Sequence, residues 1–373
     1  MNAPLFSPLA LRGVTVDNRI AVGPMCQYSA VDGDAGDWHL MHLGQFATSG
    51  AGLVITESAH VEPIGRITHG CLGLYSDANE NALGRVVQFC RANGSAKLGV
   101  QLSHAGRKGS TRLPWEGRAA PLTVDAWETI GCSGLPRAEG WPRPTPLDDS
   151  GMNRVRQAHV DAVVRASRIG FDLVELVMAH GYLLHEFLSP LSNHRDDSCG
   201  GDLDGRMRFP LSVFAAMRDI WPDDKPMGVR VSATDWIDGS WTPEDTIVLA
   251  RSLKDLGCDY IAVSSRGLSL DQDIPLGEGH QVPLASKIRA ASGLPVMAMG
   301  MIHDPNHANR VIANGDADMI ALARAFLSDP HWPWHAAAVL GQEVDYPPQY
   351  LRGYRSGWLR ERRAHSSQDR DQP

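Results

Sequence analysis

The sequence predicts an α/β protein built as a (β/α)8 barrel. Eight short apolar runs recur along the chain, and segments with helical periodicity lie between them. Several of these helical segments end in glycine just before the next run, as at Gly170, Gly257 and Gly315, which is the turn expected where a helix leads into a strand. Strands and helices that alternate in this way close most simply into a barrel. A doubly wound sheet is the alternative, but no G-x-G-x-x-G motif follows the first run or any other.

The expected strands are short and almost continuously apolar, and Gly, Asp or Pro bounds each of them. A parallel strand that is buried on both faces has this character. In chain order the expected strands are 19–22, 53–56, 98–102, 173–176, 227–231, 260–263, 296–299 and 319–322.

The expected helices place apolar residues at i, i+3 and i+4, with charged residues on the opposite face. The clear segments are 81–93, 155–168, 206–219, 243–257 and 284–291, and the less regular ones are 39–49 and 306–313.

Two stretches of the chain are expected to lie outside this repeating pattern. The stretch 103–146, after the third strand, is rich in Gly, Pro and Trp and predicts a long lid over the barrel mouth. The polar tail 364–373 is expected to be disordered. Residues 1–363 are therefore expected to form a single domain.

Composition restricts the class of protein further. Of 373 residues, 43% are hydrophobic and 21% are charged, which is typical of globular proteins and excludes disorder, collagen and coiled coils. The 35 Lys and Arg residues against 43 Asp and Glu residues give a net charge of −8 without any basic block, so neither nucleic acid nor a membrane is an expected partner. Six cysteines without a CxxC pair exclude a disulfide framework and a zinc ribbon, and a cytoplasmic protein is expected.

Polar side chains interrupt the carboxyl ends of the expected strands, where a barrel places its site residues. Arg230 lies inside an apolar run, and because an unpaired buried charge is costly, it points to a function. The other polar or glycine positions at these ends are Ser58, Gln101, His180, Tyr182, Ser264–Gly267, Gly300 and Arg324.

These positions predict a site for a phosphorylated heteroaromatic cofactor. Glycine-rich backbone after the sixth and seventh strands and Arg324 after the eighth are typical of phosphate binding. Arg230 and Gln101 supply a fixed cation and a two-sided amide, which suit a planar ring that can become anionic. Three alternatives remain open: Gln101 as a satisfied core amide, Gly300 as a simple strand end, and Arg324 as the partner of Asp329.

Seven motifs distributed over residues 4–360 carry a resemblance to a known family. They are GPMCQYSA (23–30), GRIT (65–68), QLSHAGRK (101–108), AHGYLLHEFLSPLSNHR (179–195), RFPL (208–211), VRVSATDW (229–236) and DPHWPWHAAAVLG (329–341). Together they resemble the Old Yellow Enzyme family of FMN-dependent ene-reductases, and most of all its bacterial subclass with a cysteine in the first barrel loop. QLSHAGRK and AHGYLLHEFLSP are highly specific.

The resemblance implies an FMN site whose residues carry over by position. Arg230 would stabilise the anionic reduced flavin, and Cys26 would tune its potential, although Cys26 could also be a small core residue. Ala323 stands where the family usually has glycine, but its backbone amide is retained. The implied contacts are Gly23, Pro24, Met25 and Cys26 with the ring face, Ser58, Gln101 and Arg230 with the pyrimidine edge, and Gly300, Ala323 and Arg324 with the phosphate.

The resemblance also implies a ping-pong reaction. NADPH would give a hydride to the flavin, and an activated alkene (an enone, enal, maleimide or nitroalkene) would then receive it. Tyr28 would contact the substrate and Tyr182 would supply the proton to the α-carbon, while a plain packing role is the alternative for both. The missing dinucleotide motif agrees with a nicotinamide that uses the platform of the substrate.

One position departs from the family pattern. The family places a His/His or His/Asn pair three residues apart, which hydrogen-bonds the carbonyl oxygen of the substrate. Here the second member is His180, but the first position is Val177, which has no donor. Because one preorganised donor can be worth about 10²–10³ in rate, its loss should cost about 3 kcal/mol for a carbonyl substrate.

Two accounts of Val177 remain open at this point. Enone reduction is altered or weakened, or else the substrate is less polar, bulkier or processed in the desaturating direction. A flavin protein with little alkene turnover is a further possibility that only Val177 supports.

Other candidates are expected to be structural or to act between subunits. His39 and His42 have helical spacing without a third metal ligand, and His185 is expected in the helix after the fourth strand, so no metal is expected. Arg352 stands where an arginine of the bacterial subclass reaches into the active site of a neighbouring subunit, which implies a homodimer or a dimer of dimers. An ordinary surface arginine is the alternative for Arg352.

A non-redox barrel enzyme, such as a phosphosugar aldolase or isomerase, is the alternative from another functional class. It would require a catalytic lysine inside a strand. No expected strand contains one, and Lys108 lies in a loop beyond the third strand.

Overall fold

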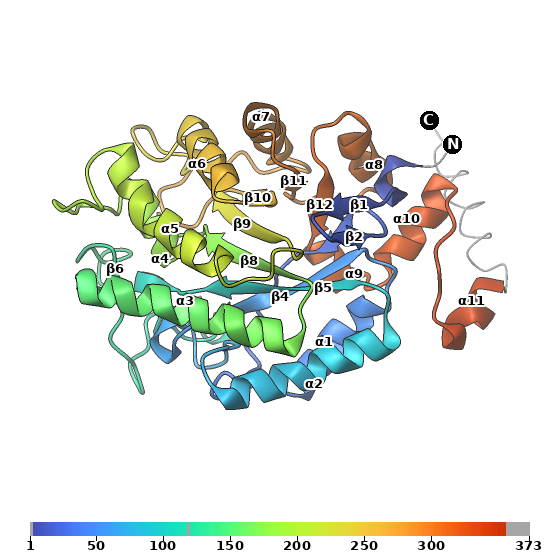
Figure 1. Ribbon diagram of the computed structural model, residues 1–373, viewed down its shortest axis with the longest axis horizontal. Coiled ribbons are helices and arrows are strands. Elements are labelled where there is room, and N and C mark those ends of the chain that lie inside the picture. The colour runs from blue at the N-terminus through green and yellow to red at the C-terminus, as the bar shows by residue number, and fades with distance from the viewer. Residues whose placement is uncertain (1–2, 118–119, 356–373) are drawn as a thin grey trace.

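The computed structural model describes residues 3–117 and 120–355 and confirms the predicted barrel (Figure 1). Its parallel strands close in the order β10–β11–β12–β3–β4–β5–β8–β9. The barrel strands are β3 (Ile20–Val22), β4 (Leu53–His60), β5 (Lys97–Ser103), β8 (Leu173–Met178), β9 (Met227–Ser232), β10 (Tyr260–Ser264), β11 (Val296–Ala298) and β12 (Met319–Leu322). Each of them coincides with an expected apolar run.

Helices surround the barrel, and a continuous hydrophobic cluster fills the space between the two layers. All seven expected helical segments are helices, α1 to α3 and α5 to α8, and further short helices occur between them. The helices are α1 (Asp37–Ala47), α2 (Asp77–Asn93), α3 (Asp149–Ile169), α4 (Leu183–Leu188), α5 (Leu203–Arg218), α6 (Pro243–Asp255), α7 (Val282–Ser292), α8 (Pro305–Ala313), α9 (Arg324–Ser328), α10 (Trp332–Leu340) and α11 (Leu351–Arg355). None of the described helices combines the length and apolarity needed to cross a bilayer.

Local sequence signals account for the ends of these helices. The Asp148 carboxylate accepts the Gly151 N–H at 2.7 Å and begins α3, and Gly170 ends that helix in the left-handed region at φ 93°. Thr242 and Asp245 cap each other at the start of α6, with each side chain accepting the backbone N–H of the other. The caps therefore lie where the sequence pattern changes from loop to helix.

Five strands extend beyond their expected carboxyl ends: β5, β9 and β10 by one serine each, and β4 and β8 by more. The strand expected at 53–56 continues to His60, so Ser58 lies inside β4 rather than after it. The pairing register of β4 shifts between Ile55 and Ser58, and such a bulge re-aims the side chains next to it. The strand expected at 173–176 continues to Met178, so Val177 also lies inside a strand.

A hairpin that the sequence pattern did not indicate closes the amino end of the barrel. It consists of β1 (Leu9–Leu11) and β2 (Val14–Val16), which pair antiparallel. Leu11 and Val16 are buried in the same hydrophobic cluster as the barrel side chains Leu53 and Met297. Three-residue strands are too short to show a period, which is why only the structure reveals them.

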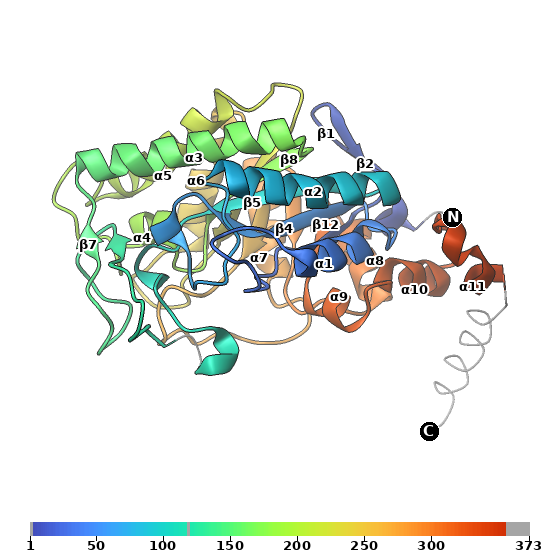
Figure 2. The same cartoon turned by 90° about the horizontal axis from the view of Figure 1, so that it is seen from below.

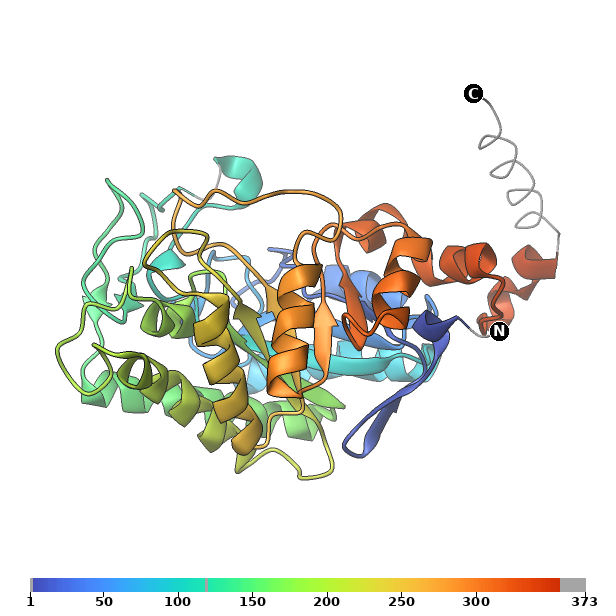
Figure 3. The ribbon, with the colours of Figure 1, turned by 90° about the horizontal axis from the view of Figure 1, so that it is seen from above.

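The segment between β5 and α3 lies over the carboxyl ends of the strands. It contains the 3₁₀ turns η3 (Gly106–Lys108) and η4 (Pro114–Glu116) and the short pair β6 (Ile130–Gly131) and β7 (Thr145–Pro146). Backbone and side-chain hydrogen bonds tie this segment to the loops after β4, β8 and β10. Figures 2 and 3 show it at the same side of the molecule as the loop between β10 and α7.

This placement agrees with a lid, but its action as a lid stays a prediction. The expected disordered tail, 364–373, lies outside the described residues.

Candidate active site

A cavity of about 570 Å3 opens at the carboxyl ends of β3 and of β8 to β12. A barrel builds its functional sites at this end. Seven residues predicted from the sequence line it: Gly23, Pro24, His180, Arg230, Gly300, Ala323 and Arg324. The fold therefore brings together side chains that lie up to 301 positions apart in the chain (324 − 23).

A line of hydrogen bonds crosses the barrel interior beneath this cavity. Ser58 Oγ donates to Gln101 Oε1 at 2.5 Å, and Gln101 Nε2 donates to Glu175 Oε1 at 2.6 Å. The Tyr260 hydroxyl donates to Glu175 Oε2 at 3.1 Å. Gln101 is thus fixed by internal partners, as the core-amide alternative states, while its second N–H and second lone pair remain for a ligand.

Arg230 lies beside this network without a strong acceptor. Its Nη2 donates only to Met299 Sδ, at 3.2 Å, and its Nε has no hydrogen-bond partner in the described residues. Thioether sulfur is a weak acceptor, and an unsatisfied buried donor costs free energy. Burial raises the pKa of Glu175, whereas the positive charge of Arg230 opposes that rise. The Arg230 guanidinium is therefore poised for an acceptor that enters the cavity.

The opposite part of the cavity combines open backbone with a cation. Gly300 has φ 116°, and a Cβ there would approach Gln281 N to 3.1 Å, so the position requires glycine. Arg324 is exposed and forms no ion pair within the described chain. The Asp329 carboxylate instead contacts His335 Nδ1 at 2.5 Å, so the alternative that Arg324 pairs with Asp329 is wrong.

His180 is held in the left-handed region, at φ 61°, where β8 leaves the barrel. Its backbone N–H donates to Ser232 Oγ at 3.0 Å, and its Nε2 lies 3.1 Å from Ser264 Oγ. The Ser264 hydroxyl has one proton and two possible acceptors, His180 Nε2 and the Val231 carbonyl. The acceptor that takes this proton decides whether His180 carries its own proton on Nδ1 or on Nε2. Burial and the nearby charge of Arg230 lower the pKa of His180 well below its usual value, which keeps the imidazole neutral.

Three further predicted residues lie outside the lining of this cavity. Cys26, Tyr28 and Tyr182 pack against the buried cluster Ile67, Cys71 and Ala105. Burial raises the pKa of all three side chains. The Tyr182 phenol therefore keeps its proton and can donate it. Met25, from the same loop as Cys26, packs against the main hydrophobic core.

Val177 occupies the barrel interior on β8, the strand that also carries Glu175. It lies in register with Arg230 and two residues from Glu175, so it faces the same side of β8 as Glu175. The side chain is 2% exposed but belongs to none of the hydrophobic clusters of the described core. Val177 is therefore a buried aliphatic side chain on the face of β8 that also carries Glu175.

The histidines expected to be structural have structural contacts. His39 Nε2 lies 3.2 Å from Glu57 Oε1, and His185 Nε2 lies 3.2 Å from Asp235 Oδ1. The Nδ1 atom of each ring accepts a backbone N–H. His42 packs edge-on against Phe46. Within the described ranges, no group of three potential ligand side chains could hold a metal ion.

The sequence analysis missed Glu175 and assigned no role to Ser264 or Arg266. Glu175 interrupts an apolar run just as Arg230 does, so the same signal could have found it. Ser264 and Arg266 carry no such signal, because polar residues are ordinary where a strand ends.

Arg352 lies on α11, is exposed and does not line the cavity of its own chain. Its role in a neighbouring subunit stays a prediction.

Comparisons with known proteins agree with this geometry. A model of the NADH:flavin oxidoreductase / NADH oxidase family matches residues 4–343. The NADPH dehydrogenase of Geobacillus thermodenitrificans (strain NG80-2) is 39% identical over 357 residues, which is 95% of this chain and 100% of that protein. The NADPH dehydrogenase of Bacillus subtilis (strain 168) is 37% identical over 356 residues, again 95% and 100%.

Solved structures point the same way. Morphinone reductase has a TM-score of 0.76 at 26% identity and covers 94% of this chain and 93% of its own. These similarities exclude the aldolase and isomerase alternative. The chain belongs to the NADH:flavin oxidoreductase / NADH oxidase family, an FMN-dependent oxidoreductase family that includes the Old Yellow Enzymes which its motifs resemble.

Proposed function

We propose that this protein is an FMN-dependent ene-reductase that oxidises NADPH and reduces the C=C bond of activated alkenes. The candidate substrates are enones, enals, maleimides and nitroalkenes. The observation that carries the proposal is the unpaired Arg230 guanidinium, which faces a cavity that it shares with His180. The Arg230 cation suits a cofactor ring that becomes anionic. The neutral His180 side chain in the same cavity suits a hydrogen bond to a substrate that stacks on that ring.

The residues at the cavity fit FMN. Arg230 Nε and the second N–H of Gln101 supply donors for the polar edge of a flavin ring. Gly300 leaves the backbone open beside Arg324, where a phosphate would find a guanidinium and amide groups. Gly23 and Pro24 form part of the wall between these two ends. The chemistry that FMN supplies when bound is two-electron transfer, which takes a hydride from the nicotinamide and delivers it to the β-carbon of the alkene.

The protein side chains would divide the remaining work. Arg230 would stabilise negative charge at the pyrimidine edge, and Glu175 and Gln101 would hold that edge of the site in place. His180 would orient the substrate oxygen through a ring nitrogen. Tyr182, which burial keeps protonated, would donate its hydroxyl proton to the α-carbon.

Val177 would leave one position at the substrate oxygen without a donor. Negative charge that develops there in the transition state would be stabilised less than in relatives with a histidine or asparagine pair. The proposed activity is therefore altered or weakened toward enones. Val177 also supports the second candidate, a flavin enzyme for less polar substrates or for the desaturating direction.

We further propose that Arg352 acts in trans within a homodimer or a dimer of dimers. Its exposure on α11, away from the cavity of its own chain, supports this placement. Mixing an Arg352→Ala subunit with a subunit inactivated at Tyr182 tests the proposal, because a residue acting in trans gives mixed dimers in which one complete site survives.

Anaerobic half-reactions test the main proposal. NADPH should bleach the flavin absorbance of the purified protein, and an activated alkene should restore it. A colourless protein that binds no FMN would refute the proposal. A protein that NADPH bleaches but no activated alkene reoxidises would support the flavin protein with little alkene turnover instead.

A further inference from the structure

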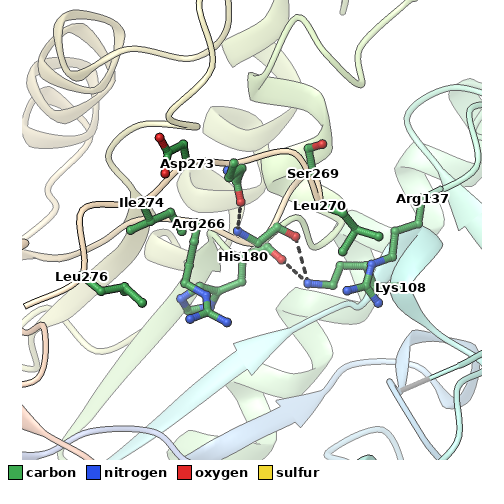
Figure 4. A pocket seen from close by; sticks show the side chains of 11 residues that line it. Lys108, Arg137, His180, Arg266, Ser269, Leu270, Asp273, Ile274 and Leu276 are labelled. Atoms are coloured by element: carbon green, nitrogen blue, oxygen red, sulfur yellow. Dashed lines mark hydrogen bonds between the residues drawn. The ribbon is translucent and has the colours of Figure 1, made fainter. Parts of the chain in front are cut away.

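A second cavity, of about 640 Å3, adjoins the first at the barrel mouth and carries an excess of positive charge. Lys108 from η3, Arg137 from the segment between β5 and α3, and Arg266 from the loop after β10 line it; these three residues are called the cationic pocket below. His180, Arg266 and Leu276 line both cavities, so the two are adjacent and share part of their wall. Figure 4 shows Arg266 next to the His180 ring and Arg137 next to Lys108.

Neither arginine of the cationic pocket is neutralised. In the described part of the chain, the side chains of Arg137 and Arg266 form no ion pair and no hydrogen bond, and Arg137 only stacks over Trp141 at 4.6 Å. Asp273 lies on the same rim but is exposed and pairs with neither of them. Arginines elsewhere, such as Arg289 with Asp318, do form such pairs. The positive charge here is therefore available to a ligand.

The lysine is held firmly among these charges. Lys108 Nζ donates to the carbonyl oxygens of His180 at 2.6 Å and Gly267 at 3.0 Å (Figure 4). Burial first, and then the charges of Arg137, Arg107 and Arg266, lower the pKa of Lys108 to about 7. A bound anion would relieve this repulsion.

We propose that the cationic pocket is an anion subsite, which binds a carboxylate or phosphate group of the molecule that stacks beside His180. The inference rests on the proposed function and adds a ligand class to it. Guanidinium groups recognise both anions in bidentate geometry, and the shared lining places the cationic pocket within reach of a ligand in the first cavity. The anion could belong to an alkene that carries a carboxylate or to the phosphates of the nicotinamide nucleotide.

Two pairs of ligands distinguish these sources. For the alkene, 4-oxopent-2-enoate is compared with its methyl ester. For the hydride donor, NADPH is compared with 1-benzyl-1,4-dihydronicotinamide, which has no phosphate. Each ligand is titrated against the FMN-loaded enzyme, the Arg137→Gln and Arg266→Gln variants and the double variant, and half-reaction rates and dissociation constants are measured.

Arg143→Gln is the matched control. Arg143 lies in the same segment as Arg137, is exposed, bonds only to the Gly134 carbonyl and does not line the cavity. Its variant has the same net charge as each single variant. It therefore separates binding in the pocket from general attraction by the charge of the protein. The flavin absorbance reports that each variant is folded and loaded.

The double variant should lower the preference for the anionic member of at least one pair by about tenfold, since hydrogen bonds between charged groups are the strong ones. A loss confined to the acid–ester pair assigns the subsite to the substrate, and a loss confined to the nucleotide pair assigns it to NADPH. Equal changes for both members of each pair, no change at all, or the same loss in Arg143→Gln would overturn the inference. If the unaltered enzyme reacts with neither member of either pair, the proposed function fails instead.

Discussion

Replacement of Val177 by histidine tests whether a missing donor limits this site. Val177 faces the same side of β8 as Glu175, whose carboxylate accepts from Gln101 and Tyr260 inside the barrel. It lies one step nearer the cavity, in register with Arg230. Val177 is 2% exposed and belongs to the buried hydrophobic side chains, so the flavin absorbance is used to check that the variant is folded and loaded. A histidine there would present a ring N–H three residues before His180.

The expected gain is that of one preorganised donor, about 10²–10³ in rate or about 3 kcal/mol of transition-state stabilisation. The assay is anaerobic stopped-flow absorbance of the flavin, with NADPH in the first half-reaction and 2-cyclohexenone in the second. Reoxidation by the enone should accelerate by about 10²-fold in Val177→His. Reduction by NADPH should change little, because hydride donation places no new charge on a carbonyl oxygen.

Val177→Leu is the size control, since it enlarges the side chain without adding a donor. It should leave reoxidation at the rate of the unaltered protein or slower. Equal reoxidation rates in Val177→His and the unaltered protein would refute the reasoning, and so would an acceleration of the same size in Val177→Leu.

Three further outcomes follow from the buried groups. Tyr182→Phe should slow alkene-dependent reoxidation by about 10²-fold or more and leave bleaching by NADPH intact, because the variant removes only the proton donor; equal rates in stopped-flow would contradict this role. Arg230→Met should weaken FMN retention at least about tenfold, measured by the fluorescence of released flavin, since it deletes a charged donor; unchanged affinity would count against the cofactor placement. Burial lowers the pKa of His60 to about 3 and of His159 to about 4, so protons bind the unfolded chain first as the pH falls below 6.5. Each ring should therefore lower the free energy of unfolding by about 1.4 kcal/mol per pH unit as the pH falls from 6.5 to about 4. Urea titrations at several pH values should show that the free energy of unfolding of His159→Asn depends less steeply on pH than that of the parent.

The barrel could be predicted because buried parallel strands need apolar side chains on both faces. That requirement ends where a strand reaches the cavity, and there the predicted strands stop before the observed ones. β4 continues through Glu57 and Ser58, because its backbone still pairs after the apolar pattern has stopped, and β8 continues through the apolar Val177 and Met178, which lie beyond its predicted end. Strand pairing is a property of the neighbouring strands, which no single run of sequence contains.

The candidate site was predictable where its chemistry is rare in a sequence. A charged residue inside an apolar run, as at Arg230, is unusual enough to identify a function. Arg137 and Arg266 give no comparable signal, since arginine in a loop is common. Only the folded chain shows that both face one cavity and that neither pairs with a counterion among residues 3–117 and 120–355.

The two layers of the barrel interior explain how Glu175 is held in place before a cofactor binds. The lower layer is apolar and includes the ring of Tyr260 together with Leu53 and Met297. The ring of Tyr260 lies in that layer, and its hydroxyl donates to Glu175. The carboxylate whose charge acts on Arg230 is therefore anchored to the core. The charge of Glu175 opposes the effect of burial on the pKa of Arg230. A cation that is present before negative charge develops beside it provides the preorganisation that makes electrostatic stabilisation effective. Tyr260→Phe removes one hydrogen bond to Glu175 and changes no residue that lines the cavity. It should therefore weaken FMN retention, measured by the fluorescence of released flavin, and unchanged retention would contradict this role of Glu175.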